Sequence, residues 1–284
     1  MEKGKLVIVP TPIGNLGDMT SRAQEALSQA DIIYAEDTRV CTKLLRAFDI
    51  KNHVERLDEF STQSKSSEIL KRLEAAEVIA YCSDAGMPGV SDPGMPLVNL
   101  ARDAGYDVEV LPGASAAATA YVASGFANQN FYFGGFFPRK DGQRADLLQS
   151  LSSLDAALIF YESPHRIVDS LEAIARIFPY RKIAVCREMT KLHEEVVVGP
   201  ISDVAEQFAS RALQGVIKGE IAFVIEGPVQ LETQEQALIS VELARTRALE
   251  LLEQGSMRKK EIAATIAEEF SIPRNQAYEI TLGK

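Results

Sequence analysis

The sequence contains few of the residues that build metal centres and disulfide frameworks. Its 284 residues include three cysteines, three histidines and no tryptophan. Cys41, Cys82 and Cys186 are far apart in the chain and odd in number, so they indicate neither a disulfide framework nor a CxxC metal site, and they fit a reducing compartment. Three histidines cannot form a histidine-rich metal cluster. We therefore expect a protein without a metal site.

Long apolar segments and an excess of basic residues are also absent. The longest apolar runs, such as residues 156–161, have the length of a strand and fall short of the roughly 20 residues that span a bilayer. The chain does not begin with the apolar segment of a signal peptide. We expect a cytoplasmic protein that does not contact a membrane. Thirty basic against 40 acidic residues give a net charge of −10, so any RNA site has to be a local patch.

What the sequence does contain is an alternation of strand and helix patterns. Hydrophobic residues make up 46% of the chain and charged residues 25%, which is typical of globular proteins. Alternating strands and helices predict an α/β fold with a mostly parallel first sheet. The predicted strands of this first series are 5–10, 31–36, 54–59, 78–83 and 108–112.

A second series of predicted strands begins after Gly125. Two of them follow each other closely, which predicts a mixed second sheet. The strands of this series are 131–137, 156–162, 182–188, 194–199 and 220–227. A polar segment at 228–236 then marks a boundary, after which only helical patterns occur. We expect an N-terminal α/β domain at 1–125, a C-terminal α/β domain at 126–230 and a helical tail domain at 231–284.

Three loops that follow predicted strands are rich in glycine and proline. They are residues 10–18, 83–94 and 112–115, and the second reads SDAGMPGVSDPG, with the pair Ser-Asp occurring twice. Glycine allows close backbone approach and proline limits flexibility, so such loops can form a rigid wall. Ligands of open α/β sheets bind beyond the carboxyl ends of the strands. The loops therefore predict a ligand site, with tight surface turns as the alternative.

The first of these loops differs from the known phosphate-binding fingerprints. Pro12 stands where the first glycine of a dinucleotide-binding fingerprint would be, and no Gly-Lys-Ser/Thr follows. No basic residue occurs between Ile8 and Thr20. Phosphate charge would therefore be met only by backbone amides, and a cationic or neutral ligand is favoured.

Several motifs in the chain have the order found in one enzyme family. They are VPTPIGNLGDMT (9–20), AEDTR (35–39), SDAGMPGVSDPG (83–94), LPGASA (111–116), SGF (124–126), GFFPRK (135–140), FYESPHR (160–166), REMTKLHEE (187–195) and GEIAFVIEG (219–227). In this order they resemble the tetrapyrrole methylase superfamily and, within it, the ribosomal RNA small subunit methyltransferase I branch. The resemblance covers about residues 5–228.

The resemblance implies a fold, a cofactor and a reaction. The fold would be of tetrapyrrole-methylase type, and the cofactor S-adenosylmethionine. The reaction would be 2′-O-methylation of a cytidine in the decoding region of 16S rRNA, within the small ribosomal subunit, by a homodimer. Two alternatives stay open: methylation of another acceptor such as a tetrapyrrole, and a noncatalytic ribosome-assembly binder, because a fold does not settle a function.

The resemblance also implies which residues contact the cofactor. A sulfonium cation suits carbonyl groups and a carboxylate, and Asp84 is the nearest carboxylate in the loop at 83–94. Carried over by motif, the cofactor contacts are Asp84, Ala85, Gly86, Met87, Val90, Ser91, Ser115, Tyr161 and Ala222.

On the acceptor side, the reaction needs groups that orient a ribose hydroxyl and remove its proton. Polar residues at strand ends supply the candidates, which are Asp37, Arg39, Glu162, His165, Arg166, Glu188, Lys191 and Glu194. Among them we predict catalytic roles for Glu162, Arg166, Glu188 and Lys191. The alternative for Glu162 and Arg166 is an ion pair capping the following helix. Lys191 is a base only if its pKa is lowered, and otherwise would anchor a phosphate.

Contacts to RNA are predicted from basic residues in two places. Arg39, Lys43 and Arg46 recur at the spacing of one helix face, and Arg139 and Lys140 follow a predicted strand. A solvated helix face is the alternative for the first group, and acidic neighbours dilute the second.

Two further features bear on how RNA would be held. The helical tail is interpreted as a packing or ribosome-docking module, with an RNA-binding helix-turn-helix as the alternative. At residues 57 and 58 the chain has Leu-Asp where the family commonly has Tyr-His, so the acceptor side differs from the family pattern.

Overall fold

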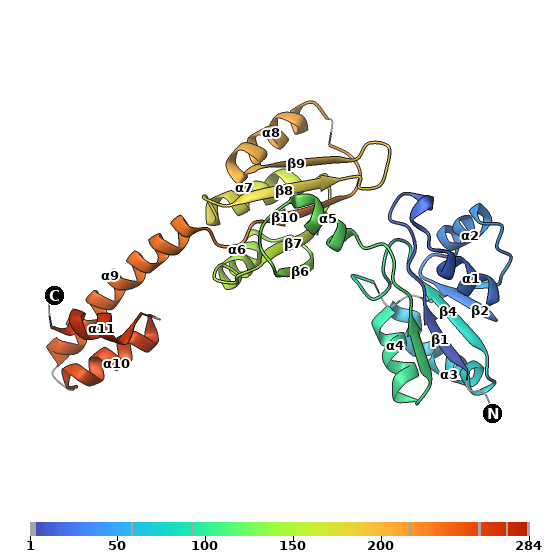
Figure 1. Ribbon diagram of the computed structural model, residues 1–284, viewed down its shortest axis with the longest axis horizontal. Coiled ribbons are helices and arrows are strands. Elements are labelled where there is room, and N and C mark those ends of the chain that lie inside the picture. Colours follow the sequence, from blue (N-terminus) through green and yellow to red (C-terminus); the bar gives the residue numbers. More distant parts are fainter. Residues whose placement is uncertain are drawn as a thin grey trace. The chain divides into compact units, whose positions relative to one another are not determined.

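The computed structural model describes residues 4–57, 59–92, 94–215, 217–254, 257–270 and 272–282. The chain folds as two compact units (Figure 1). The first consists of Met1–Leu151 and Asp155–Glu226, and the second of Ser152–Leu154 and Gly227–Lys284. The first unit carries two five-stranded sheets, and the second is helical.

The first sheet is entirely parallel, with strand order β3-β2-β4-β1-β5. Its strands are β1 (Lys5–Ile8), β2 (Ile32–Ala35), β3 (Val54–Arg56), β4 (Val78–Cys82) and β5 (Asp107–Val110). Its helices are α1 (Ser21–Gln29), α2 (Thr38–Ala47), α3 (Glu59–Glu74) and α4 (Gly94–Asp103), and a 3₁₀ turn, η1, covers Leu16–Asp18.

Helices cover both faces of this sheet. Apolar side chains of α1 and α2 pack on one face, and those of α3 and α4 pack on the other. Because both faces are buried, β1, β2 and β4 are almost continuously apolar. The expected parallel sheet is confirmed.

Each strand of this sheet is shorter than the sequence predicts, and β3 is shortened most. The pattern predicts a strand at 54–59, whereas β3 ends at Arg56 and α3 begins at Glu59. β3 is an edge strand that pairs only with β2, so few backbone hydrogen bonds extend it. Leu57 is buried, and Asp58 lies outside the described residues.

Two cysteines that are distant in sequence meet in the core of this layer. The Sγ atoms of Cys41, on α2, and Cys82, at the end of β4, lie 3.4 Å apart, and both thiols are free and buried. Nothing in the spacing of 41 residues indicates this contact.

The second sheet is mixed, as predicted, with strand order β6-β7-β10-β8-β9. β6 pairs parallel to β7, and the other pairs are antiparallel. Its strands are β6 (Phe131–Phe136), β7 (Ala157–Glu162), β8 (Lys182–Arg187), β9 (Glu195–Pro200) and β10 (Ile221–Ile225).

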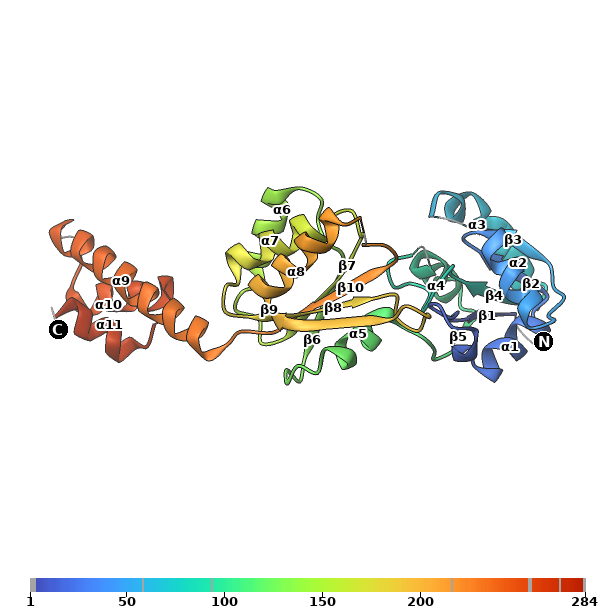
Figure 2. The same ribbon diagram turned by 90° about the horizontal axis from the view of Figure 1, so that it is seen from above.

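The two faces of the second sheet are covered unequally (Figure 2). Helices α6 (Asp141–Ser150), α7 (Ile167–Ile177) and α8 (Ile201–Leu213) pack on one face. The other face holds α5 (Ala116–Ser124), a short helix that contacts it through Ala117 and Ala120. The small side chains of α5 bring its backbone close to the sheet.

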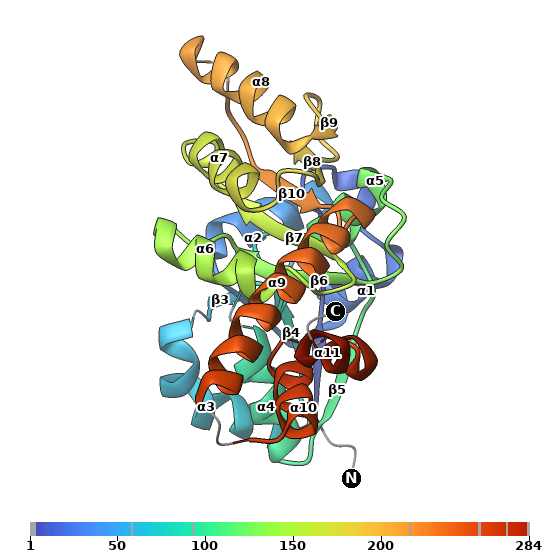
Figure 3. The same ribbon diagram turned by 90° about the vertical axis from the view of Figure 1, so that its left-hand side faces the viewer.

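The described residues of the second unit form the helices α9 (Gln230–Gln254), α10 (Lys259–Glu269) and α11 (Arg274–Thr281). Figure 3 shows α10 and α11 beside the later part of α9. Their shared core includes Ile262, Ile266, Ile272, Ala277 and Ile280. The polar segment predicted as a boundary is mostly helix, because α9 already begins at Gln230.

The α/β fold class with a helical appendage is confirmed. The predicted limits of three domains, at residues 125 and 230, stay a prediction.

Candidate active site

The glycine-rich loops come together because their strands are neighbours. β1 lies between β4 and β5 in the sheet, so the loops after these strands leave the same edge side by side. Thr11 and Gly86 exchange two backbone hydrogen bonds of 3.0 Å, which join the loops at 10–18 and 83–94. A Cβ added at Gly113 would lie 2.3 Å from Cγ of Pro10. The third loop can approach the first only with glycine at this position.

The two Ser-Asp pairs of the loop at 83–94 have different tasks. The Oδ1 atom of Asp92 accepts hydrogen bonds from the amides of Gly89 (2.6 Å) and Gly94 (2.9 Å), so this carboxylate holds the loop in shape. Asp84 in the first pair is exposed. It is therefore the carboxylate that a ligand can reach.

The environment of Asp84 makes its negative charge costly. Although Asp84 is exposed, the surrounding loops remove part of the water from its carboxylate and so raise its pKa above the ordinary value, and the nearby carboxylate of Asp37 adds to this effect. The Asp37 amide, which donates to Oδ1 of Asp84 at 3.1 Å, and the Arg39 guanidinium act in the opposite direction but do not cancel it. A cationic ligand beside Asp84 would relieve this cost.

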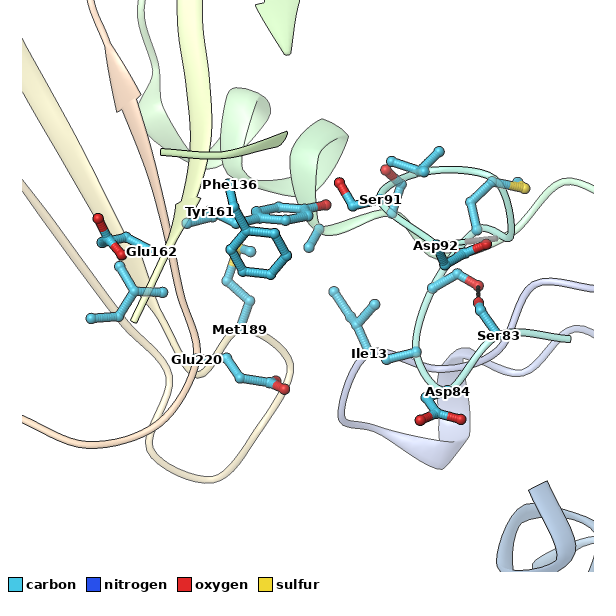
Figure 4. A pocket seen from close by; sticks show the side chains of 18 of the residues that line it. Ile13, Ser83, Asp84, Ser91, Asp92, Phe136, Tyr161, Glu162, Met189 and Glu220 are labelled. Carbon is cyan, nitrogen blue, oxygen red and sulfur yellow. Dashed lines mark hydrogen bonds between the residues drawn. The ribbon is translucent and has the colours of Figure 1, made fainter. Parts of the chain in front are cut away.

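A pocket of about 570 Å³ lies beside these loops, and residues of both sheets line it (Figure 4). All nine residues predicted to contact a cofactor line this pocket, namely Asp84, Ala85, Gly86, Met87, Val90, Ser91, Ser115, Tyr161 and Ala222. The volume suits a ligand of the size of a small cofactor.

The charged side chains that line the pocket are all acidic, although Glu162 and Glu220 are paired with Arg166 and Lys191, which lie outside the lining. The pocket lining includes five carboxylate residues and, among the residues described there, no lysine, arginine or histidine. The five are Glu36, Asp84, Asp92, Glu162 and Glu220. This lining favours a cation and disfavours a phosphate, as the sequence of the first loop predicts.

Several lining residues are missing from the sequence-based set. Glu36 directly follows β2, so it could have been chosen as a polar residue at the carboxyl end of a strand. Ile13 lies in the first glycine-rich loop. Phe136, Met189 and Glu220 come from the second sheet and its loops. No spacing in the sequence places these three beside the loops of the first sheet.

Tyr161 forms part of the pocket wall contributed by β7. Burial raises the pKa of Tyr161, although a hydrogen bond from the Ala117 amide opposes this. Its ring packs edge to face with those of Phe133 and Phe136, at centroid distances of 4.9 and 5.6 Å. The tyrosine therefore stays neutral and presents a fixed aromatic wall.

Glu162 and Arg166 form the ion pair that was the alternative prediction for them. Nε of Arg166 donates to Oε1 of Glu162 at 2.7 Å, and the Ser163 amide donates to the same oxygen at 2.7 Å. Oγ of Ser170 donates to Oε2 at 2.6 Å, and the Glu162 side chain is fully buried. The pair fixes the start of α7, and the exposed His165 lies in the turn before it.

Glu188 and Lys191 belong to a second charged cluster. Nζ of Lys191 donates to Oε1 of Glu188 at 2.9 Å and to Oε2 of Glu220 at 2.6 Å. Burial lowers the pKa of Lys191, but the hydrogen bonds to Glu220 and Glu188 outweigh it, so this pKa lies above its ordinary value. Hydrogen bonding to Lys191 in turn lowers the pKa of Glu188. Lys191 is therefore a cation at neutral pH.

This cluster touches the first glycine-rich loop. A Cβ added at Gly14 would lie 2.5 Å from Cγ of Lys191 and 2.9 Å from Oγ1 of Thr190. Glu188 and Thr190 have positive φ values of 51° and 66°, which is unusual for residues with side chains. The turn at 188–191 thus holds Lys191 against the loop and places Glu220 on the pocket.

The basic residues predicted to contact RNA are exposed. Arg39, Lys43 and Arg46 lie on the exposed face of α2, with Cys41 and Leu45 buried on the other face. Arg39 pairs with Asp37, and this interaction, led by the side-chain hydrogen bond, lowers the pKa of Asp37.

The second group of basic residues lies before α6. Arg139 and Lys140 are exposed there. By contrast, Arg144 is buried, donates to the Pro138 carbonyl at 2.8 Å and pairs with Asp141. Arg144 is thus part of the fold, and the cationic surface here is limited to Arg139 and Lys140.

Comparison with known proteins decides the family. Residues 5–205 match the family described as Tetrapyrrole (Corrin/Porphyrin) Methylases. The chain is 41% identical over 283 residues to ribosomal RNA small subunit methyltransferase I of Pasteurella multocida, covering 98% of this chain and 97% of the relative. It is 38% identical to the protein of the same name from Halalkalibacterium halodurans, covering 98% and 95%. The chain belongs to the tetrapyrrole methylase family.

Solved structures support the fold of this methyltransferase. Diphthine synthase superposes with a TM-score of 0.60 at 15% identity, covering 82% of this chain and 94% of that one. Uroporphyrin-III-C-methyltransferase from Thermus thermophilus gives a TM-score of 0.51 at 17% identity, covering 78% and 92%. At these identities the likeness concerns the fold alone.

S-adenosylmethionine is the methyl donor of this family, and the pocket of this methyltransferase fits it. Its sulfonium is a cation, and the lining is acidic. Among the described residues, no group of three His, Cys, Asp or Glu is arranged to hold a metal ion. In the same part of the chain, no helix is long and apolar enough to cross a membrane.

Proposed function

We propose that this methyltransferase methylates the 2′-hydroxyl of a cytidine in the decoding region of 16S rRNA. The observation that carries the proposal is the acidic pocket formed by the glycine-rich loops, in a chain that aligns over nearly its whole length with enzymes named for small-subunit rRNA methylation. We further propose that it acts in the cytoplasm as a homodimer on the small ribosomal subunit.

The chemistry divides between the bound cofactor and the chain. The cofactor would supply an electrophilic methyl group bonded to its sulfonium sulfur, which would leave as a neutral thioether. The loops at 83–94 and 112–115 would hold the cofactor, and Asp84 would offer its carboxylate to the positive charge. The chain then has to align the ribose hydroxyl and accept its proton as the new bond forms.

We propose acceptor-side roles for Glu162, Arg166, Glu188 and Lys191. The first two are held rigidly at the start of α7, next to the pocket residues Ser163 and Pro164. Because Lys191 is protonated, we assign it the contact with an RNA phosphate and not proton removal.

The charge of Lys191 can be tested with two substitutions. Lys191→Arg keeps a cation and should retain single-turnover methyl transfer within a few-fold, whereas Lys191→Gln should lower it by at least about 10-fold. Between about pH 6 and about pH 9, deprotonation of Lys191 should not change the wild-type rate, because a lysine normally titrates near 10.4. An Arg variant as inactive as the Gln variant, with both folded, would show that a neutral Lys191 is required.

Capture of RNA should depend on the exposed basic residues. We propose phosphate contacts for Arg39, Lys43, Arg139 and Lys140. Arg39→Ala and Arg139→Ala should each raise the apparent KM for small subunits and reduce the salt slope by roughly one contact, with the rate at saturating enzyme unchanged. Arg176→Ala, on α7, is a control that should leave both quantities unchanged. Identical salt slopes for all variants would remove these residues from the RNA interface.

Labelled S-adenosylmethionine tests the proposed function directly. Incubated with the protein and small subunits that lack the modification, it should transfer its label to 16S rRNA. A uroporphyrinoid acceptor should remain unlabelled. Label in the tetrapyrrole and none in RNA would assign another acceptor, and binding without transfer to either would indicate a noncatalytic binder.

A further inference from the structure

Phe136 is an aromatic side chain left exposed at the pocket. It lines the pocket beside Tyr161, and 66% of its surface is accessible (Figure 4). The next residue, Phe137, is 1% exposed and packs in the core against Phe160 and Phe223. Leaving a phenylalanine in water forgoes the free energy of burying it. An unfilled aromatic surface beside a ligand pocket indicates a ligand that covers it.

A local irregularity in the sheet directs Phe136 to this place. Phe133 pairs with Ile159 and Phe136 with Tyr161, so three steps on β6 match two steps on β7. Successive side chains of a strand alternate between faces, and the extra residue therefore puts Phe133 and Phe136 on the same face. Both rings contact Tyr161.

Glycine makes the irregularity possible. Gly135 has a φ of 68°, in the region that favours glycine, and a Cβ added at Gly134 would lie 2.2 Å from Cε1 of Phe160. In a regular strand Phe136 would point to the opposite face, toward the helices α6 to α8. The bulge thus turns an apolar ring out of the core and toward the pocket.

The charge around Phe136 changes sign along the chain. The pocket carries carboxylates and no cationic side chain among its described residues. The exposed Arg139 and Lys140, which are not among the residues that line the pocket, follow Phe136 within four residues of the chain. An aromatic ring next to basic residues is the arrangement that binds an unstacked base and its phosphates.

We propose that Phe136 stacks on the base of the acceptor nucleotide and so holds its ribose at the pocket. This inference rests on the proposed function. A small ligand inside a pocket is enclosed on most of its surface, whereas the ring of Phe136 is mostly open to solvent. A base presented by a large RNA approaches from that open side, and it is therefore the ligand that suits the ring.

Kinetics of substituted enzymes test the role of the ring. Phe136→Ala should lower kcat/KM for small subunits by roughly 5- to 150-fold, the effect of losing one base-aromatic stack, with affinity for S-adenosylmethionine within about 2-fold of wild type. Phe136→Tyr should restore most of the loss, because it keeps the ring. Phe131→Ala is the matched control, since Phe131 begins the same strand, is 48% exposed and lies outside the pocket lining.

The outcomes separate the two proposals. If the wild type methylates 16S rRNA and Phe136→Ala has the same kcat/KM, the stacking role is overturned and the proposed function stands. Absence of methylation by the wild type would overturn the proposed function itself. A loss of cofactor affinity equal to the loss of kcat/KM would place the ring on the cofactor and also overturn the stacking role.

Fluorescence offers a readout that does not depend on activity. The sequence has no tryptophan, so Phe136→Trp introduces a single reporter. With S-adenosylhomocysteine bound, oligocytidylate should quench the emission of the tryptophan introduced by Phe136→Trp. The quenching should occur at the concentrations at which a labelled oligonucleotide binds the protein. The emission of the Phe131→Trp variant should not change. Quenching by S-adenosylhomocysteine alone, or none with oligocytidylate bound, would contradict stacking on the acceptor base.

Discussion

A Gly86→Val variant should lose measurable affinity for S-adenosylmethionine. Gly86 has a φ of 83°, and its Cβ would lie 3.2 Å from Cγ2 of Ile13 and 3.5 Å from the Ala114 carbonyl oxygen. A β-branched residue is strained in this conformation. Because Gly86 also exchanges two hydrogen bonds with Thr11, the strain would separate the loops that form one wall of the pocket.

Calorimetry in the presence of a chelator measures this effect. The wild type should bind about one cofactor per chain, and Gly86→Val should weaken binding by at least about 100-fold, since a misplaced loop removes several contacts together. Gly105→Val controls for backbone strain alone, because Gly105 has a φ of 77° with nothing within 4 Å of its Cβ position and lies outside the pocket lining. Wild-type affinity in a folded Gly86→Val protein would show that this loop is only a surface turn.

A Glu162→Ala variant should be strongly destabilised. The buried carboxylate accepts hydrogen bonds from Arg166, the Ser163 amide and Ser170. Its removal leaves a largely buried guanidinium without its ion-pair partner, and such a loss costs about 3–5 kcal/mol of the free energy of unfolding. Urea denaturation gives this value. Glu109→Ala, which breaks partly exposed pairs with Lys5 and Arg22, should cost less than about 1 kcal/mol.

Stability and catalysis can be separated at Glu162. If the Glu162→Ala protein unfolds at nearly the wild-type urea concentration but transfers methyl groups slowly in single turnover, Glu162 acts in the chemistry and not in holding α7. If it is destabilised as expected, rates have to be measured where the variant is still folded. Equal stability together with equal rates would contradict both roles.

Sequence patterns located the elements well where burial dictates them. Near-continuous apolar runs such as Val78–Cys82 mark strands buried on both faces, and the helical spacing of Ile167, Leu171 and Ile174 marks the buried face of α7. The pattern failed at β3, an edge strand of three residues. There local hydrogen bonding, and not apolar periodicity, decides where the strand ends.

Contacts between distant segments are where prediction from the sequence stops. Asp84 and Ser115, which are chosen from the loops after strands and from the motif resemblance, line the same pocket because parallel strands bring their carboxyl ends together. Nothing local distinguishes Asp84 from Asp92, whose carboxylate holds the loop. Phe136 reads as a core residue in the run FYFGGFF, and only the bulge in β6 turns it outward.

Mapping of 2′-O-methyl groups on 16S rRNA tests whether this methyltransferase modifies a cytidine ribose in the decoding region. Small subunits from cells lacking this protein would be treated with the purified enzyme and S-adenosylmethionine, and nucleosides and positions would be identified by mass spectrometry. We expect one 2′-O-methylcytidine in the decoding region that is absent before treatment and present afterwards. A methyl group on a base, or rRNA that is identical before and after treatment, would contradict this expectation.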